Sequence, residues 1–406
     1  MAYQNVGTPR FYIDYLTYWH SMGYIQNILV VDHHGASLGG DKFFIGLDPA
    51  SPTILNISDE EGNTDQIAVG INFPYQQYLP IRVLDSINYM GVLGHDLQGF
   101  GMSARGFHRD SEDAVLGAHD ETARINNTNI VNAEAPNNET EIINAEYTGL
   151  GSSSAQQFNA FNDNGFSMFK VDGYESGALE GIDRLVFLFR KYGLVGEGVN
   201  QTFDNIHNDA NPLTGSWNIN SITLGHFYDM PVSADLKLNM EVEFDGYDQI
   251  DTTGGSTLTN IRYTGSPQWG DNNPWEIGDS NPIYKRNGRR NWTLKFSYIA
   301  DKDLFASNYS SNNWLSNSTD NSDYSSNNDL TEIDGNEFEY TLMDDDSFIA
   351  KVLNFVGNGQ RFIFQADNTN NNPDQFAICV LDQDSLKISQ VAFKTYNISL
   401  KIREVW

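Results

Sequence analysis

Histidine and cysteine are the side chains that could ligate a transition metal or carry nucleophilic chemistry, and this chain has eight histidines and one cysteine. His33 and His34 are adjacent, so in a strand they would point to opposite faces and could not share a metal. Three of the other six histidines, His95, His108 and His119, are spread through glycine-rich sequence without a metal-binding spacing. Cys379 lies in the apolar segment "FAICVL", which favours a small buried side chain. We therefore predict no metal site and no disulfide.

Serine and carboxylate chemistry is tested in the same way. Ser103 in "GFGMSARG" is not in the frame of a nucleophile turn, and "GLGSSSAQ" (149–156) lacks the lysine of a phosphate loop. A glycosidase requires a specific pair of carboxylates. Among the 54 acidic residues, no pair has neighbouring sequence that sets it apart from the others. We identify no catalytic or cofactor-binding residue and expect no enzyme; a glycan-degrading enzyme remains the weaker alternative.

The segment "FQADNTNNNPDQFAI" (364–378) offers the hard oxygen ligands that calcium prefers. A helix-loop-helix calcium site starting at Asp367 would need a glutamate at its twelfth position, where Ile378 stands. A looser cage stays open as an alternative, with ligands from Asp367, Asn370, Asn372 and Asp374. Because Asn and Asp also close turns and Pro373 fixes φ, the sequence favours a turn between two strands.

Length and charge bound the class of protein. A chain of 406 residues predicts two or three domains, and its formal charge of −30 argues against a nucleic-acid partner because phosphates need clustered cations. The first residues do not resemble a signal peptide, and no segment is apolar for long enough to span a membrane. We expect a soluble protein made in a cytoplasm.

Period-two alternation of apolar and polar residues is the strongest structural signal. It predicts half-buried strands from Leu236 to Phe244, from Trp292 to Tyr298 and from Ile398 to Ile402. Four further segments read as strands: "SITLGHFY", "QRFIFQA", "FAICVL" and "LKISQVAF". The stretch "DTTGGST" (251–257) suits a hairpin turn or loop. Residues 216–406 are therefore predicted to form a mainly antiparallel β domain.

One short amphipathic helix is predicted near residues 346–356 of this domain. Its apolar residues fall at helical spacing: Phe348, Val352, Leu353 and Val356. One of the three aspartates at 344–346 is expected to cap it, and Gly357 to end it in a left-handed conformation. The polar segment 307–329 is expected to be an exposed loop.

Residues 1–215 are predicted to be β-rich, with a polar excursion near 126–147. "RFYIDYLTYW", "KFFIGL" and "YLPIRVLDSINYMGVLG" read as strands, although 81–93 could be helical. The run 185–189 is either a short helix or a buried strand. The overall class is thus mainly β, with antiparallel sandwich or barrel domains.

Four stretches carry a resemblance to a known family: "AYQNVGTPRFYID", "NGRRNWTLKFSYIADKDLF", "RFIFQADNTNNNPDQFAICVL" and "YNISLKIREVW". Together they resemble virion structural proteins of marine tailed bacteriophages, notably contractile-tailed phages of cyanobacteria and related hosts. The resemblance covers residues 216–406 and, less fully, 1–15. It implies a non-enzymatic virion protein of the tail or baseplate that forms homo-oligomers, contacts other virion proteins and has a fold similar to tail-tube proteins.

Exposed aromatic residues carry the alternative within this family, a receptor- or carbohydrate-binding fibre or decoration subunit. The candidates for stacking on host glycans or for burial at a subunit interface are Trp269, Trp275, Trp314 and Tyr324. The interface role is favoured. No cofactor and no membrane partner are expected.

Overall fold

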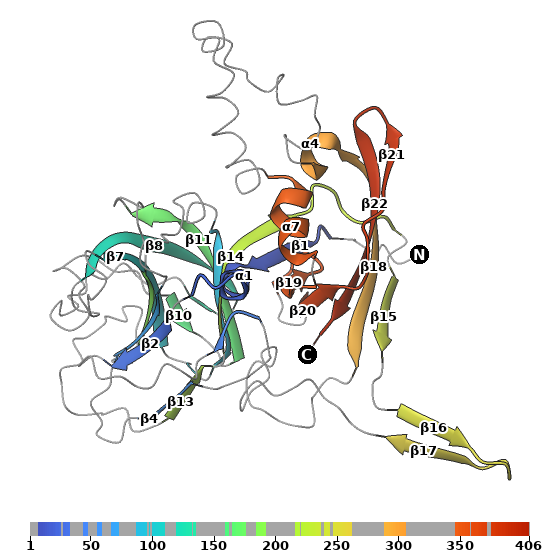
Figure 1. The fold of residues 1–406 in the computed structure, drawn as a ribbon, viewed down its shortest axis with the longest axis horizontal. Helices are drawn as coiled ribbons and strands as arrows, with labels where there is room; N and C mark the ends of the chain where they lie inside the picture. Colours follow the sequence, from blue (N-terminus) through green and yellow to red (C-terminus); the bar gives the residue numbers. More distant parts are fainter. Residues whose placement is uncertain are drawn as a thin grey trace, which may run out of the picture. The chain divides into compact units, whose positions relative to one another are not determined.

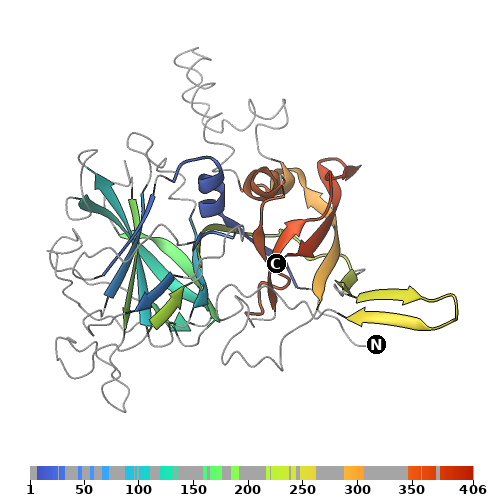
Figure 2. The same ribbon diagram turned by 60° about the horizontal axis from the view of Figure 1, so that its bottom comes forward.

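The computed structural model describes residues 7–25, 27–32, 44–47, 55–58, 66–72, 87–95, 97, 100–109, 119–131, 133–134, 159–161, 165–175, 184–191, 216–219, 221–236, 239–243, 247–261, 288–305, 346–357, 359–371 and 375–405. The chain forms two compact units (Figures 1 and 2). Unit 1 comprises residues 1–13, 226–267 and 281–406, and unit 2 comprises 14–225 and 268–280. The fold is mainly β and its pairings are mainly antiparallel, which confirms the predicted class.

The division into units differs from a single cut at residue 215 in one instructive way. The N-terminal residues 1–13 belong to the same unit as the C-terminal residues 281–406. The strand β1 (Arg10–Asp14) explains this, because it pairs with β19 (Phe362–Gln365) rather than with a strand close in sequence.

Unit 2 is built from a run of hydrogen-bonded strands. In spatial order they are β2 (Asn27–Asp32), β5 (Gln66–Asn72), β12 (Arg184–Lys191), β7 (Phe100–Arg109), β8 (His119–Val131), β11 (Gly165–Glu175), β6 (Tyr89–His95), the first part of β14 (Ser221–Asp229) and β3 (Phe44–Ile45). The strand β10 (Asn159–Phe161) pairs with β7 and β9 (Ala133–Glu134), and β4 (Leu55–Ser58) pairs with β13 (Ser216–Ile219).

Two predictions for the first half are settled by these elements. The run 185–189 is a strand, within β12, and 89–93 is a strand rather than a helix. Of the polar excursion predicted near 126–147, residues 126–131 belong to β8, whereas residues 132 and 135–147 lie outside the described residues.

The segment "RFYIDYLTYW" is only partly a strand, so that prediction was wrong for its second half. After β1 it turns into helix α1 (Tyr15–Ser21), because the Asp14 side chain accepts a hydrogen bond from the Thr17 N–H and caps the first turn. Its apolar residues run without a clear period, so spacing alone could not separate strand from helix.

Unit 1 is an antiparallel sheet that the chain enters at both ends. Its spatial order is β15 (Asn239–Glu243), β18 (Arg289–Ala300), β22 (Thr395–Glu404), β20 (Phe376–Leu381), β19, β1 and the last part of β14. The strand β21 (Ile388–Ala392) pairs with the first part of β22. A separate hairpin joins β16 (Tyr247–Asp251) to β17 (Thr257–Ile261) through the predicted turn at 251–257, where Gly255 has φ +81°.

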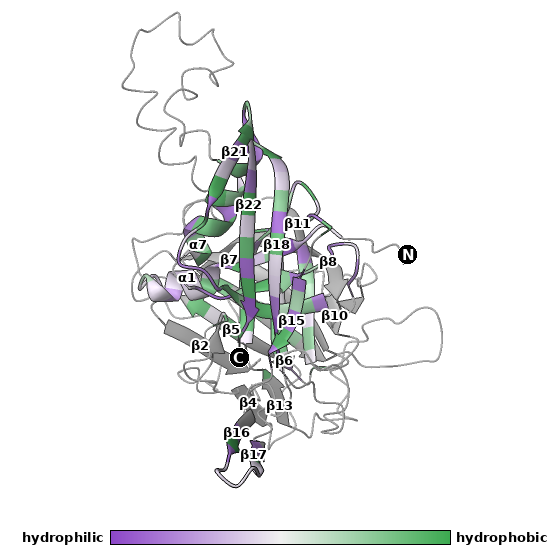
Figure 3. Cartoon of the chain, turned by 90° about the vertical axis from the view of Figure 1, so that its right-hand side faces the viewer, coloured by the Kyte–Doolittle hydropathy of each residue, from purple (hydrophilic) through white to green (hydrophobic). Residues whose placement is uncertain are grey.

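One face of this sheet is the core of unit 1. Alternate residues of its strands are buried on that face: Phe11, Trp292, Leu294, Phe296, Phe362, Phe364, Cys379, Ile398, Leu400 and Ile402. Both green and purple segments occur along β18 and β22 in Figure 3, as expected for strands with one buried and one polar face. The interpretation of Cys379 as a buried apolar side chain is confirmed.

A helix closes the core of unit 1, as predicted for 346–356. It consists of the π-helix η4 (Ile349–Leu353) and α7 (Asn354–Val356), and Phe348 packs edge-on against Phe11 with ring centroids 5.7 Å apart. The predicted stop was wrong: Gly357 has φ −60°, and Gly359 is the residue with positive φ. The Ser347 hydroxyl, rather than Asp346, accepts the Ala350 N–H.

Two other predictions about exposure were wrong. Tyr298 does not continue the buried row of β18: the register shifts between Phe296 and Ile299, so Ile299 is buried and Tyr298 is 74% exposed. The strand predicted from Leu236 is β15, but it has no buried face, because Met240 and Val242 are 56% and 41% exposed. Unit 1 also contains a second short helix, α4 (Asp301–Leu304).

Candidate functional site

A serine and a histidine meet inside unit 2, and this pair is the first test for nucleophilic chemistry. The Ser167 hydroxyl lies 3.0 Å from His95 Nε2, and both side chains are fully buried. The Leu97 N–H donates to His95 Nδ1 at 3.2 Å, which places the imidazole proton on Nε2. A protonated Nε2 cannot take the serine proton, and burial lowers the pKa of His95 to about 3. The contact is structural.

The Asp14 carboxylate of unit 2 is buried and accepts four hydrogen bonds. Its Oδ2 accepts from the Thr17 N–H and hydroxyl, while its Oδ1 accepts from the Thr223 hydroxyl at 2.9 Å and the Leu224 N–H at 3.1 Å. Burial raises the pKa of Asp14. The backbone of Gly46 approaches this carboxylate so closely that a Cβ there would collide with it. Because both carboxylate oxygens are already hydrogen-bonded, Asp14 anchors α1 to β14.

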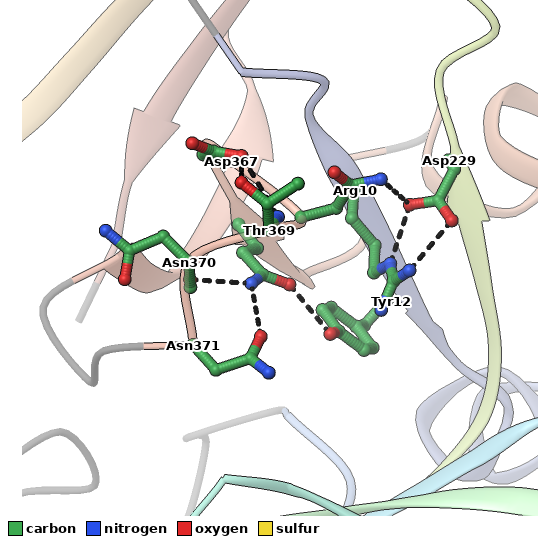
Figure 4. A network of polar contacts seen from close by, with 9 residues as sticks. Arg10, Tyr12, Asp229, Asp367, Thr369, Asn370 and Asn371 are labelled. Carbon is green, nitrogen blue, oxygen red and sulfur yellow. Dashed lines mark hydrogen bonds and ion pairs between the residues drawn. The ribbon is translucent and has the colours of Figure 1, made fainter. Parts of the chain in front are cut away.

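Residues 366–371 form the first part of the connection between β19 and β20, which are antiparallel with Phe364 opposite Ala377. Asp367 Oδ1 accepts from the Thr369 N–H at 3.0 Å and from its hydroxyl at 2.7 Å, and the Asn370 N–H donates to the Asp367 carbonyl at 3.0 Å (Figure 4). The predicted turn is therefore present, whereas Asp374 lies outside the described residues. Within the described part of the chain, no cluster of three or more His, Cys, Asp or Glu side chains could hold a metal ion.

Gln365 ties this loop to β1. Its amide nitrogen donates to the Asn370 carbonyl at 2.9 Å and to Asn371 Oδ1 at 3.0 Å, and its amide oxygen accepts from the Tyr12 hydroxyl at 2.8 Å. Burial raises the pKa of Tyr12 to about 12. The described oxygen atoms of Asn370 and Asn371, in the loop considered above as a calcium site, thus accept hydrogen bonds that hold the hairpin against β1.

A second polar link joins β1 to β14 beside this loop. Arg10 donates two hydrogen bonds to the Asp229 carboxylate, at 2.6 and 2.8 Å (Figure 4). The Asn368 amide donates to the same carboxylate at 3.0 Å. The guanidinium also stacks over the Phe227 ring, 4.1 Å from its centroid. These contacts hold residues 7–13 in the unit.

The C-terminal strand is locked by an ion pair. Glu404 is fully buried and accepts from the Arg290 backbone N–H at 2.9 Å and from two guanidinium nitrogens at 3.1 Å. Arg290 also donates to the Phe376 carbonyl at 2.6 Å. A more exposed pair on the opposite face joins Arg403 to Glu243 at 3.0 Å. Both pairs position strands rather than a substrate.

Exposed apolar side chains of unit 1 form the remaining candidate site, and they fall in three groups. The edge group is Leu236, Met240 and Val242, with Leu236 82% exposed. The hairpin pair is Ile250 and Leu258, which face each other across β16 and β17 and are 66% and 60% exposed. The third group lies on the bulge of β18 and near the β21–β22 turn: Tyr298, Val391 and Phe393. These groups are therefore the candidate contact surfaces of unit 1.

The polar face of the same sheet is unusual for so acidic a chain. Four cations share it by register and alternation: Arg289, Lys295, Lys401 and Arg403, named here the cationic strip. Glu241 and Glu243 of β15 are the acids on that face of the three strands β15, β18 and β22. The strip is therefore a net positive surface on a protein with a formal charge of −30.

The aromatic residues predicted as interface or ligand contacts all lie outside the described residues: Trp269, Trp275, Trp314 and Tyr324. His33, His34 and the loop 307–329 lie there too. Sequence reasoning missed the edge group, because the pattern of β15 reads as a half-buried strand. It also missed the hairpin pair, which the symmetric spacing of Ile250 and Leu258 about the Gly-Gly turn could have indicated.

Comparison with known proteins identifies no relative: no protein-family model, no curated protein and no solved structure matches this chain. None of the helices within the described ranges combines the length and the apolar character that a membrane crossing needs.

Proposed function

We propose that this protein is a non-enzymatic structural component of a tailed-phage virion, located in the tail or baseplate and assembling by symmetric self-association. The observation that carries the proposal is the arrangement of the four stretches that resemble phage virion proteins. Their described parts form five adjacent strands of one sheet, in the order β18, β22, β20, β19 and β1. Stretches far apart in sequence thus make up one structural unit.

The chemistry of the described residues supports the same role. The buried titratable side chains act as anchors: Asp14 bonds four donors, His95 is a neutral hydrogen-bonding group, and Glu404 pairs with Arg290. The exposed features are apolar side chains on strand edges and hairpins, which suit contacts between subunits. We include a tail-tube-like fold for unit 1 in the proposal, on the basis of fold analogy with the family it resembles.

Localisation in the particle tests the proposal. Virions of the phage that encodes this chain would be purified on a density gradient, and their proteins quantified by mass spectrometry beside a soluble phage enzyme as a control. We expect the chain at a fixed multiple of copies per particle and its density in the tail or baseplate by electron cryomicroscopy. Recovery only in the particle-free fraction, with the control enzyme, would overturn the proposal.

A further inference from the structure

We propose that the β16–β17 hairpin of one copy adds to the free edge of β15 in a second copy, with Ile250 and Leu258 covering Met240 and Val242. This inference rests on the proposed function, because it names the surface through which the copies would associate. Its two halves are both present on every chain, as a donor hairpin and an acceptor edge.

The acceptor is a sheet edge that is open on one side. Residues 239–243 pair with β18 through Glu243 opposite Arg289 and Asn239 opposite Thr293, and no described strand pairs with the other side of β15. The backbone groups on that side can template a further strand over five residues, roughly 17 Å. A partner that extends the sheet would also cover the exposed side chains of Met240 and Val242.

The donor is a hairpin that forms its own two-stranded sheet. Its turn is well defined, since Thr252 both accepts the Ser256 N–H at 3.1 Å and donates from its hydroxyl to the Ser256 carbonyl at 2.9 Å. Yet every side chain described between residues 249 and 260 is exposed or half-buried. A two-stranded ribbon with an uncovered apolar pair is marginally stable in water, so contact with a partner would stabilise it.

The alternation of side chains in the hairpin and in β15 allows their apolar residues to lie on the same face of an extended sheet. Met240 lies opposite Trp292 and therefore extends the apolar face of the sheet, while Glu241 points to the polar face. In the hairpin, Ile250 is on one face and Asp251 is on the other. A pairing that places Ile250 over the apolar face therefore directs Asp251 towards the polar face.

Charge favours a second copy as the occupant. The hairpin strands and turn, residues 247–261, contain two aspartates and no lysine or arginine, and Asp251 is the one on the face opposite Ile250. On the polar face of the acceptor, Glu241 and Glu243 of β15 lie at the edge itself, and the cationic strip lies one and two strands further in, on β18 and β22. The four cations outnumber these two acids, so this face as a whole attracts an acidic hairpin, whereas most of the protein surface must carry the acid excess. Because donor and acceptor are different surfaces, the contact is head-to-tail and generates rings or filaments.

Single substitutions separate the two halves of the contact. Leu258→Asp removes the donor and Val242→Asp removes the acceptor, while Thr259→Asp places the same charge on the opposite, exposed face of the donor strand. The full-length chains would be compared by sedimentation velocity and light scattering. We expect the wild type to form oligomers, the first two variants to associate at least about tenfold more weakly, and Thr259→Asp to behave like the wild type.

Mixing the two variants gives the decisive measurement. Val242→Asp keeps an intact hairpin and Leu258→Asp keeps an intact edge, so an equimolar mixture should form a 1:1 dimer that neither variant forms alone. This result also excludes misfolding as the cause of the single-variant losses. The inference would be overturned if the wild-type chain stayed monomeric or if Thr259→Asp weakened association as much as the other two variants. It would also be overturned if the mixture stayed monomeric, which is the result expected when the hairpin of each chain covers the β15 edge of the same chain. Particle localisation remains a separate test of the virion role.

Discussion

Neighbouring strands β18 and β15 carry the same alternation of apolar and polar residues, but only β18 buries it. Trp292 and Leu294 of β18 are 4% and 2% exposed, whereas Met240 and Val242 of β15 are 56% and 41% exposed. The two strands are adjacent and in register, with Met240 opposite Trp292. The difference therefore arises from position in the sheet and not from strand propensity.

What covers β18 is a set of residues distant in sequence. Trp292 packs against Phe364 of β19 with ring centroids 5.2 Å apart, and Phe364 packs against Phe11 of β1. β15 lies one strand further out, at the edge, where no described side chain completes a second layer over it. A period-two pattern thus specifies which face is apolar, while the tertiary arrangement decides whether that face is buried in one chain or left for a partner.

The two ion pairs of β22 should show the largest contrast. Replacing Glu404 by Gln leaves the Arg290 cation, which is 11% exposed, without its counter-ion, and we expect a loss of about 3–5 kcal/mol in the free energy of unfolding. Glu243→Gln breaks the pair to Arg403, whose side chains are 45% and 31% exposed, and should cost about 0–1 kcal/mol. Urea unfolding of both variants measures the contrast, and equal losses would contradict it.

Two leucines give the matched comparison for apolar burial. Leu294→Ala removes a side chain that is 2% exposed and should lower the free energy of unfolding by about 2–5 kcal/mol. Leu236→Ala removes one that is 82% exposed and should change it by less than about 0.5 kcal/mol. The same urea titration applies, at protein concentrations low enough to keep the chain monomeric. A large loss for Leu236→Ala in the monomer would show that the β15 edge is covered within one chain.

Much of unit 1 follows from its sequence. The alternation of Ile398, Leu400 and Ile402 specifies β22, and the apolar runs on both sides of the Asn-rich loop specify the β19–β20 hairpin. These predictions succeed because each depends on neighbours within a few residues. They fail where a distant contact or a local irregularity decides the outcome.

The failures have identifiable physical causes. Tyr298 adopts φ +63° at a bulge that no periodicity reveals, and it leaves the buried row that its spacing predicts. Met240 is exposed because β15 is the last of the described strands at this side of the sheet. That position can be seen only once the strands are paired. For the candidate site, the aromatic residues chosen from composition lie outside the described residues, whereas the hairpin pair required the register of β16 and β17.

A buried histidine that contacts η4 should make the stability of unit 1 depend on pH. His226 Nε2 donates to the Lys351 carbonyl at 2.5 Å, and burial, with the charge of Lys351, lowers its pKa to about 3. The unfolded chain binds a proton near the ordinary histidine pKa of about 6.5 while the folded chain does not, so stability is present above that pH and falls as the pH is lowered towards the folded pKa. The slope is at most about 1.4 kcal/mol per pH unit for this residue.

His226→Asn removes the titrating imidazole, and its shorter amide does not reproduce the Nε2 bond to the Lys351 carbonyl. The loss of that bond is the same at every pH, so the fall between pH 6.5 and 4 should still flatten by up to one proton, measured as urea unfolding against pH. His20→Asn, at the exposed end of α1, controls for the loss of one imidazole. If the slope were unchanged in His226→Asn, the helix formed by η4 and α7 would not shield the His226 side chain from water.

The smallest expected effect concerns the loop that could have been a calcium site. Asp367→Ala removes the acceptor for the Thr369 N–H and hydroxyl and should lower the free energy of unfolding by about 1 kcal/mol. Because the Asp367 carboxylate already closes the turn, the loss should be the same with and without calcium. Isothermal titration of the wild type with calcium should show no tight site, and Asn370→Ala, which keeps the backbone donor to Asp367, is the matched control. Calcium-dependent stability lost only in Asp367→Ala would instead assign the loop to an ion, and its polar side chains would then do more than fix β19 against β20.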